Sequence, residues 1–227
     1  MIPPWLSLLS WLSLAVGLAS AGWIAIDVVR HPLKMMVMNL AWPLCGLFGP
    51  GFMVWAYYAW GRNTDAGHPF GVTVFKGALH CGSGCTLGDV ISESLLLAFP
   101  ALTTVFGLGW LFPDKVFAAW VLDFAMAFII GIIFQYLAIV PMRKLSPAEG
   151  IRQAIKADAA SLTAWQVGMY AFMAVAQFGI FRAGLHAKLT ADMPVFWFMM
   201  QIAMLCGLAT SYPVNWCLIR AGIKKAM

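Results

Sequence analysis

Long apolar runs with very few charges constrain this sequence more than any other feature. Residues 4–29 carry a single charged side chain, that of Asp27. About 20 consecutive apolar residues are enough for a helix to cross the hydrocarbon core of a bilayer. Of the 227 residues, 62% are hydrophobic and 10% are charged, whereas a soluble domain has about 25% charged residues. We therefore expect an all-α, polytopic membrane helical bundle, because lipid does not penalise an apolar exterior.

The apolar runs predict about six transmembrane helices. We expect them over residues 4–29, 33–60, 82–112, 115–140, 162–185 and 193–220. Residues 142–162 alternate charged and apolar side chains, which predicts an amphipathic helix on the membrane surface. The chain then divides into residues 1–69, with two N-terminal transmembrane helices and a loop, and residues 70–227, with four transmembrane helices and the interfacial helix.

The basic residues predict an orientation. Six spans would place both termini on one side, together with nine of the 14 Lys and Arg, and leave five on the other side. Loops rich in Lys and Arg stay in the cytoplasm, so we expect both termini to be cytoplasmic. These loops also account for the net charge of +5, which therefore does not indicate a nucleic-acid partner. The expected location is a bacterial inner (cytoplasmic) membrane, with the lipid bilayer and other membrane subunits as partners.

One segment places reactive side chains within an apolar region. Residues 80–93 read HCGSGCTLGDVISE and begin with His80. Polar side chains recur in it at intervals of four, at Cys81, Cys85, Asp89 and Glu93. Four residues turn a helix by about 400°, so these side chains would form one stripe. A carboxylate in the bilayer core costs about 2.5–3.5 kcal/mol, which a cation, a proton or a basic partner should offset.

A soft transition metal is the first candidate for this stripe, because thiolates and imidazole suit copper(I) and zinc. The predicted metal ligands are His80, Cys81, Cys85, Asp89 and Glu93. The Cys-x3-Cys spacing differs from the Cys-x2-Cys of zinc knuckles, so two other interpretations stay open. The cysteines and glycines would be small packing residues between helices, or the two thiols would form a redox pair. No organic cofactor is predicted.

Two further polar residues lie inside predicted spans, Asp123 and Asn215. Polar side chains within spans usually face the interior of the bundle. A lone carboxylate needs a partner, so Asp123 either pairs with Arg182 or takes part in moving a proton or an ion.

Three segments resemble a known bacterial membrane family. They are HCGSGCTLGDVISE (80–93), IKADAASLTAWQVGMY (155–170) and FWFMMQIAMLCGLATSYPVNWCLIRAGIKKAM (196–227). The family is domain of unknown function 4396, and the resemblance covers roughly residues 70–227. It implies a multi-span membrane domain and no established activity. The residues that match the family pattern are His80, Cys81, Cys85, Gly88, Asp89, Tyr212, Pro213 and Asn215.

The residues support three functional hypotheses. The first is a membrane protein that binds copper or zinc for metal transport, delivery or homeostasis. The second is an accessory subunit of a larger membrane metallo-oxygenase or respiratory complex. The third is a thiol-based membrane oxidoreductase that uses Cys81 and Cys85. The sequence leaves open whether the protein is an enzyme.

Overall fold

The computed structural model describes residues 2–62, 67–143 and 145–225, and this part of the chain is helical without strands. In chain order the helices are α1 (Pro4–Arg30), α2 (Met36–Phe48), α3 (Phe52–Ala56), η1 (Tyr57–Gly61), α4 (Phe70–Ala98), α5 (Leu102–Val105), α6 (Lys115–Arg143), α7 (Pro147–Ala174), η2 (Val175–Gly184) and α8 (Pro194–Arg220). The elements η1 and η2 are π-helices, and each continues the α-helix before it. The all-α prediction is confirmed for the described residues.

Four helical stretches are long and apolar enough to cross a membrane. They are Pro4–Arg30, Lys115–Pro141, Pro147–Gly184 and Pro194–Arg220. Only 22% of the most apolar window of Pro4–Arg30 is buried, so most of its side chains are available to lipid. These helices identify a membrane protein, but the predicted six spans are not confirmed.

Residues 33–60 form a helical hairpin instead of the predicted single span. α2 ends at Phe48, and the turn to α3 consists of Gly49, Pro50 and Gly51. Gly51 has a φ of +75°, a left-handed conformation that glycine adopts without steric cost. This Gly-Pro-Gly break is the physical reason why one apolar run becomes two short antiparallel elements.

The hairpin enters and leaves the bundle at the same end. At its tip, the Gly51 amide donates to Oγ of Ser20 in the middle part of α1, at 3.2 Å. Beyond the tip, the Tyr57 hydroxyl donates to Asp27 near the end of α1, at 2.8 Å. The hairpin therefore reaches only part of the way along α1 and then returns.

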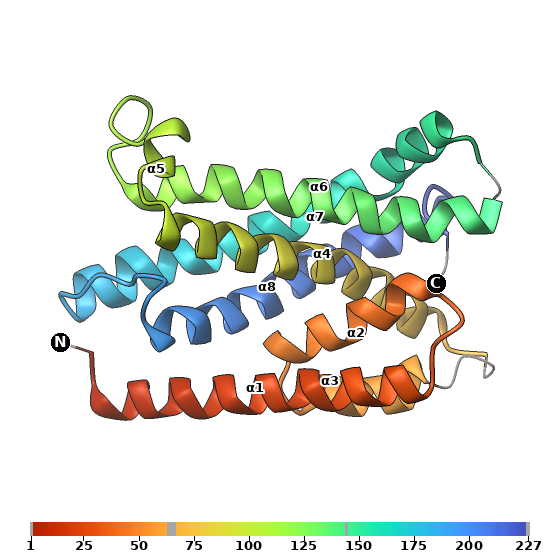
Figure 1. Cartoon of the computed structure of the whole chain (residues 1–227), viewed down its shortest axis with the longest axis horizontal. Coiled ribbons are helices and arrows are strands. Elements are labelled where there is room, and N and C mark those ends of the chain that lie inside the picture. The colour runs from red at the N-terminus through yellow and green to blue at the C-terminus, as the bar shows by residue number, and fades with distance from the viewer. Residues whose placement is uncertain (1, 63–66, 144, 226–227) are drawn as a thin grey trace.

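The two termini lie at opposite ends of the bundle, as Figure 1 shows. α1, α6 and α8 run in one direction, and α4 and α7 run in the other. The parallel helices α1 and α8 are in contact, and the Ser13 hydroxyl donates to Oε1 of Gln201 at 2.7 Å. The hairpin turns back within the bundle and does not run its length, unlike the single span predicted over residues 33–60.

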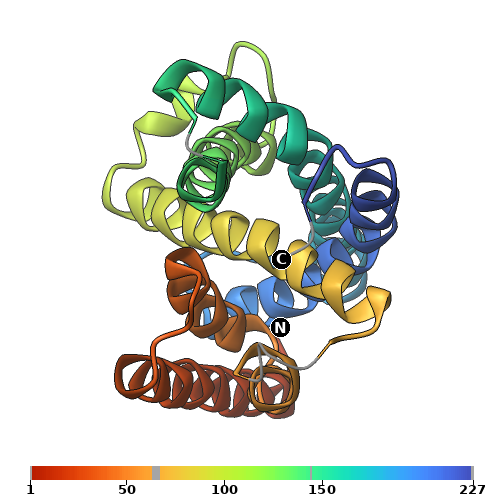
Figure 2. The same ribbon diagram turned by 90° about the vertical axis from the view of Figure 1, so that its right-hand side faces the viewer.

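α4 is enclosed by other helices. It packs against α2, α6, α7 and α8, and Figure 2 shows it in the middle of the bundle. Residues 77–86 are buried on every side of the helix. Because protein rather than lipid surrounds this part of α4, it can carry polar residues that a lipid-facing helix could not.

Residues 147–174 form one continuous helix, α7. The prediction treated the surface helix over 142–162 and the following span as separate elements. In Figure 2 the first turns of α7 pass across the end of the bundle before the helix continues alongside α8. Asp158 and Ser161 are already fully buried, whereas Ile155 and Lys156 are exposed, so one face of the second half of the predicted surface helix packs into the interior.

Candidate functional site

Small residues bring α4 very close to α6. A Cβ atom added at Gly84 would lie 2.7 Å from Cα of Gly131, and one added at Gly88 would lie 2.5 Å from the backbone nitrogen of Ala127. Helix backbones approach this closely only where the contacting residues are small. The packing interpretation is therefore confirmed for these two glycines. It does not account for the polar residues beside them.

Five buried side chains form a polar cluster at the end of the bundle where α8 ends. We call it the lysine cage, and its members are Cys81, Asp158, Ser161, Asn215 and Lys224. The Cys81 thiol donates to Oδ1 of Asp158 at 2.8 Å and lies 3.0 Å from Oγ of Ser161. Lys224 donates from Nζ to Sγ of Cys81 at 3.0 Å and to Oδ1 of Asn215 at 2.8 Å. None of the five side chains is more than 1% exposed. The lysine cage joins α4, α7, α8 and the segment that follows α8.

Lys224 and Asp158 form an ion pair at the centre of this cage. Nζ of Lys224 lies 2.6 Å from Oδ1 of Asp158, and both side chains are 0% exposed. Burial acts to lower the pKa of Lys224, but the carboxylate of Asp158 outweighs it and holds this pKa above its usual range. Lys224 is therefore positively charged at physiological pH, and one carboxylate compensates it.

Three carboxyl groups gather farther along α4, toward the other end of the bundle. Asp89 and Asp123 are 0% exposed, and Glu93 is 8% exposed. Ser92 donates to one oxygen of Asp123. Within the described ranges, the other oxygen of Asp123 has no hydrogen-bond partner, and Asp89 has none within 3.5 Å, the side-chain amide of Gln166 being its polar neighbour. No ion pair formed by described residues includes Asp89 or Asp123.

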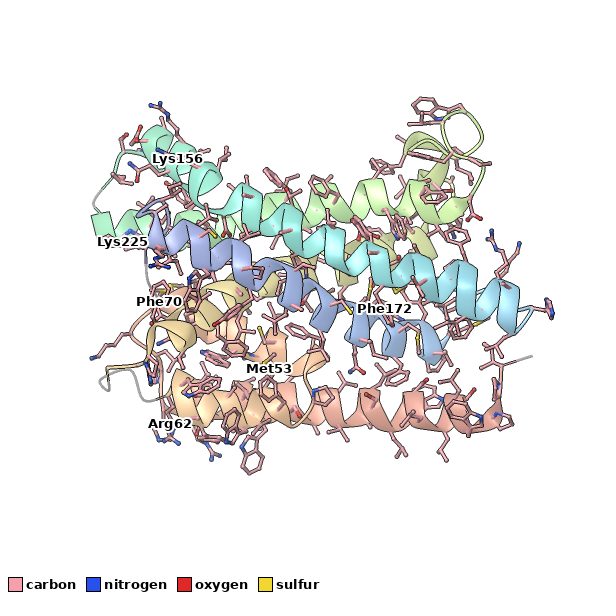
Figure 3. The ribbon with its side chains drawn as sticks, turned by 180° about the vertical axis from the view of Figure 1, so that it is seen from behind. Met53, Arg62, Phe70, Lys156, Phe172 and Lys225 are labelled. Atoms are coloured by element: carbon pink, nitrogen blue, oxygen red, sulfur yellow. The ribbon has the colours of Figure 1, made fainter. Side chains whose placement is uncertain are left out.

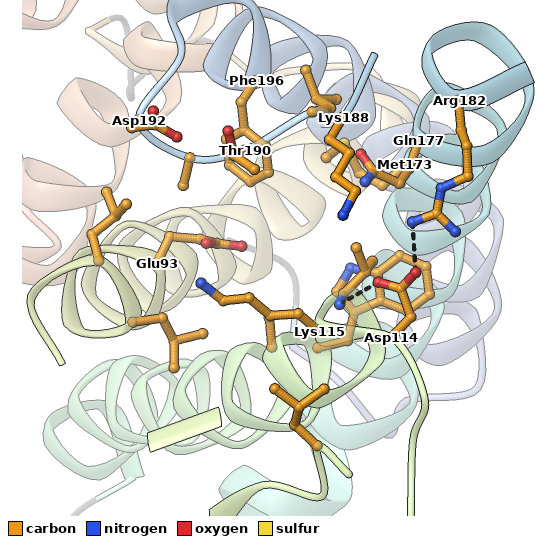
Figure 4. A pocket seen from close by; sticks show the side chains of 18 of the residues that line it. Glu93, Asp114, Lys115, Met173, Gln177, Arg182, Lys188, Thr190, Asp192 and Phe196 are labelled. Atoms are coloured by element: carbon orange, nitrogen blue, oxygen red, sulfur yellow. Dashed lines mark hydrogen bonds and ion pairs between the residues drawn. The ribbon is translucent and has the colours of Figure 1, made fainter. Parts of the chain in front are cut away.

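Glu93 faces a pocket of about 490 Å³ at the end of the bundle where α6 and α8 begin. In Figure 4 the side chains of Glu93 and Lys115 point toward each other, and the ammonium of Lys188 points into the pocket. At the rim, Nη2 of Arg182 donates to Oδ2 of Asp114 at 2.6 Å. The pocket therefore has a rim with charges of both signs and reaches Glu93 of α4, whereas Asp89 and Asp123 are not among its lining residues.

A comparison with known protein families shows which family the chain belongs to. A model of a domain of unknown function, DUF4396, matches residues 72–224. The chain belongs to this family. The match includes the whole lysine cage and all three carboxyl groups, so both clusters lie within the DUF4396 domain. No curated protein and no solved structure matches the chain.

The predicted copper or zinc ligands of this DUF4396 domain do not converge on one point. A rise of 1.5 Å per residue separates the backbone positions of Cys81 and Glu93 by about 18 Å, while zinc ligands lie about 2.0–2.3 Å from the metal. The described residues contain no group of three or more His, Cys, Asp or Glu side chains that could hold a metal ion. The stripe is a row of separate positions along α4, which does not fit one resident metal.

His80 and Cys85 of the DUF4396 domain lie near the two clusters, and no hydrogen bond or ion pair among the described residues joins their side chains to a member of either cluster. The ring of His80 faces α6, with its centroid 6.4 Å from that of Phe134 and the side chain of Gln135 as its polar neighbour. Cys85 is a buried free thiol one turn beyond Cys81, which is also buried and free. Thiol–disulfide exchange requires access to the attacking sulfur, so this burial does not favour the redox-pair hypothesis.

The proposed pairing of Asp123 with Arg182 is wrong. Arg182 pairs with Asp114 at the pocket rim, and Asp123 accepts from Ser92. The physical reason is depth: Asp123 lies nine residues after Asp114, a rise of about 13 Å along the helix direction. Arg182 lies in the last turn of the π-helical η2, near the rim, and pairs there with Asp114.

Three members of the lysine cage were not among the residues predicted from the sequence: Asp158, Ser161 and Lys224. Asp158 and Lys224 looked like ordinary charges of a surface helix and a terminus. The available signal was Gly222, two residues beyond the last basic residue of α8. A glycine in this position often ends a helix and reverses the chain, and Gly222 does so with a φ of +70°.

Proposed function

We propose that this DUF4396 protein moves cations across the membrane along the buried polar side chains of α4. The observation that carries the proposal is the pair of carboxyl groups of Asp89 and Asp123. Both are fully buried, and neither has an ion-pair partner among the described residues. Such groups are costly within a membrane and typically mark an ion or proton pathway.

The positions of the polar groups support a continuous route. Glu93 lines the pocket, and Asp89 lies one helical turn deeper, about 6 Å along α4. Another 12 Å or so along the helix lies Cys81, at the edge of the lysine cage. A cation entering the pocket would meet carboxyl groups first, and the cage would form the far end of its route.

The proposed route crosses the bundle because α4, which carries its side chains, runs from one end of the bundle to the other. We infer that α1, α4, α6, α7 with η2, and α8 cross the membrane, and that α2, α3 and η1 form a re-entrant hairpin. Irregular backbone within a membrane is tolerated where protein surrounds it, as it does at the tip of the hairpin beside Ser20.

The basic residues support one orientation of this topology. Figure 3 shows Arg62, Lys156 and Lys225 at the same end of the bundle. By the bounds of the helices that carry or precede them, ten described Lys and Arg belong to this end: Arg30, Lys34, Arg62, Lys76, Arg143, Arg152, Lys156, Arg220, Lys224 and Lys225. Three belong to the other end: Lys115, Arg182 and Lys188. By the positive-inside rule the C-terminus is cytoplasmic, and the N-terminus and the pocket face the outside of a bacterial cytoplasmic membrane.

Reconstitution into liposomes tests the proposal. Uptake of radioactive rubidium, acidification of the lumen, and uptake of copper(I) and zinc would each be followed for the wild type and for Asp89→Asn. We expect flux of at least one of these cations in the wild type. We expect Asp89→Asn to slow it roughly tenfold or more, because the carboxylate that offsets the charge of the cation inside the membrane is lost. A tenfold slowing corresponds to about 1.4 kcal/mol added to the barrier.

Glu149→Gln provides the matched control, because Glu149 is an acidic residue of α7 that does not line the pocket of Glu93 and has a side chain 42% exposed. It should keep the wild-type flux. Absence of flux for every cation in folded wild-type protein, or equal flux in Asp89→Asn, would contradict the proposal. Either result would favour a packing or accessory role in a larger complex.

A further inference from the structure

The environment of the Lys224 ammonium resembles the coordination shell of a cation. Four acceptors surround Nζ: Oδ1 of Asp158 at 2.6 Å, Oδ1 of Asn215 at 2.8 Å, Sγ of Cys81 at 3.0 Å and the carbonyl oxygen of Gly77 at 3.2 Å. An ammonium has only three N–H bonds to donate. The cage therefore offers more acceptors than this side chain requires.

Lys224 reaches the cage because the chain reverses direction after α8. The amides of Ile223 and Lys224 both donate to the carbonyl of Leu218, at 3.0 and 3.1 Å. Gly222 adopts the left-handed conformation that ends the helix. The ammonium is thus delivered by a short segment after α8 and is not fixed on a membrane-spanning helix.

We propose that the lysine cage is a binding site for a large monovalent cation, and that Lys224 occupies it as a tethered substitute. This deepens the proposed function and depends on it, because the cage would be the cytoplasmic end of the cation route. Withdrawal of the segment after α8 would free the site, and its return would close the route.

Charge and size both indicate the class of ion. The cage holds one carboxylate, Asp158, which is balanced by one positive charge. The distances of 2.6–3.2 Å from Nζ to the acceptors exceed the metal–ligand distances of zinc and magnesium, about 2.0–2.3 Å, and mostly exceed those of calcium, about 2.3–2.6 Å. An ion the size of ammonium or potassium fits these positions without contraction of the cage.

Equilibrium binding in detergent tests the site without any flux measurement. Rubidium would be the probe, measured by equilibrium dialysis and elemental analysis on Lys224→Met, which keeps an unbranched side chain but removes the charge. We expect about one rubidium ion per chain in Lys224→Met, bound at least tenfold more tightly than in the wild type. Lys225→Met, which alters the exposed neighbouring lysine, should behave like the wild type. Lys224→Met/Asp158→Asn should bind no rubidium.

A second measurement on the wild type decides the question if Lys224→Met does not fold. Rubidium should compete with Lys224 for the cage and increase acylation of its amine, read by peptide mass spectrometry, while choline at the same ionic strength should not. The proposal would be overturned if folded Lys224→Met bound no rubidium, or if rubidium did not change the extent of Lys224 acylation. Binding without flux would refute the proposed function alone, and flux without binding would refute only the cage as a cation site.

Discussion

Nζ of Lys224 lies 2.6 Å from Oδ1 of Asp158, and neither side chain has any exposed surface. These two residues are 66 positions apart in the sequence, so their contact fixes the segment after α8 against α7. Removing one partner from a buried ion pair leaves a buried charge without compensation and costs about 3–5 kcal/mol.

Stability should therefore depend on this pair in a non-additive way. We expect Asp158→Asn to destabilise the protein by about 3–5 kcal/mol. Adding Lys224→Met to Asp158→Asn should restore part of the loss, because no unpaired charge then remains. Thermal unfolding in detergent of both single variants and the double variant measures the coupling. Additive losses would show that the two groups do not interact.

The contact between α4 and α6 should not tolerate a side chain at Gly88. A Cβ there would lie 2.5 Å from the backbone nitrogen of Ala127, so the backbones themselves would have to separate. We expect Gly88→Ala to lower the unfolding midpoint strongly, with a cost of about 1–3 kcal/mol or more, as for other overpacked sites. Gly22→Ala is the control, because no atom lies within 4 Å of a Cβ at that position. Equal stability of the two variants would contradict this close approach.

The membrane topology can be tested at the termini. Because the hairpin at residues 49–51 turns back, the N-terminus should be outside and the C-terminus in the cytoplasm. Single cysteines appended to each end of a variant without accessible native thiols, probed in intact cells with a membrane-impermeant maleimide, would measure this. We expect labelling at the N-terminus only. Labelling of both ends or of neither end would support an even number of crossings.

The ion pair between Arg182 and Asp114 at the pocket rim should contribute little to stability. Partial burial acts to raise the pKa of Asp114, but the hydrogen bond from Arg182 outweighs it and holds this pKa below its ordinary value. The pair is partly exposed, with side chains 43% and 22% accessible, so we expect Asp114→Asn to cost only about 0.2–1 kcal/mol at neutral pH.

The sign of the pH dependence follows from the lowered pKa of Asp114. Its stabilising effect is complete above the pKa of an unfolded Asp, about 3.9, and disappears as the pH falls through the lower folded-state value. The difference in unfolding midpoint between wild type and Asp114→Asn should thus shrink only in strongly acidic buffer. A difference that grows on acidification would contradict this assignment.

The sequence was most informative where a helix faces lipid. The run over residues 4–29 predicted α1 almost to the residue, because an exposed span must be apolar along its length. The run over residues 33–60 was misleading, since a hairpin enclosed by protein has the same composition as a span. In that run, the Gly-Pro-Gly turn at 49–51 was the distinguishing signal.

The candidate site could be predicted only along one helix. The spacing of Cys81, Cys85, Asp89 and Glu93 predicted a polar stripe, and α4 carries all four as buried residues of one helix. The contacts of Cys81 with Asp158 and Lys224 span 77 and 143 positions, and helical periodicity holds no information about them. Long-range packing therefore changed the interpretation of this stripe. In place of one set of metal ligands, α4 contributes to an ion-paired cage and, farther along, to a group of carboxyl side chains without ion-pair partners.

The most direct test of cation movement along α4 is the electrical current that the protein carries. Proteoliposomes adsorbed on a solid-supported membrane would be exposed to rapid jumps in potassium, copper(I) or zinc concentration and, separately, in pH. We predict a transient current for at least one of these jumps in the wild type and in Glu149→Gln, and loss of that current in folded Asp89→Asn. Wild-type protein without current for any of these ions, or an Asp89→Asn current equal to that of the wild type, would contradict cation movement along α4.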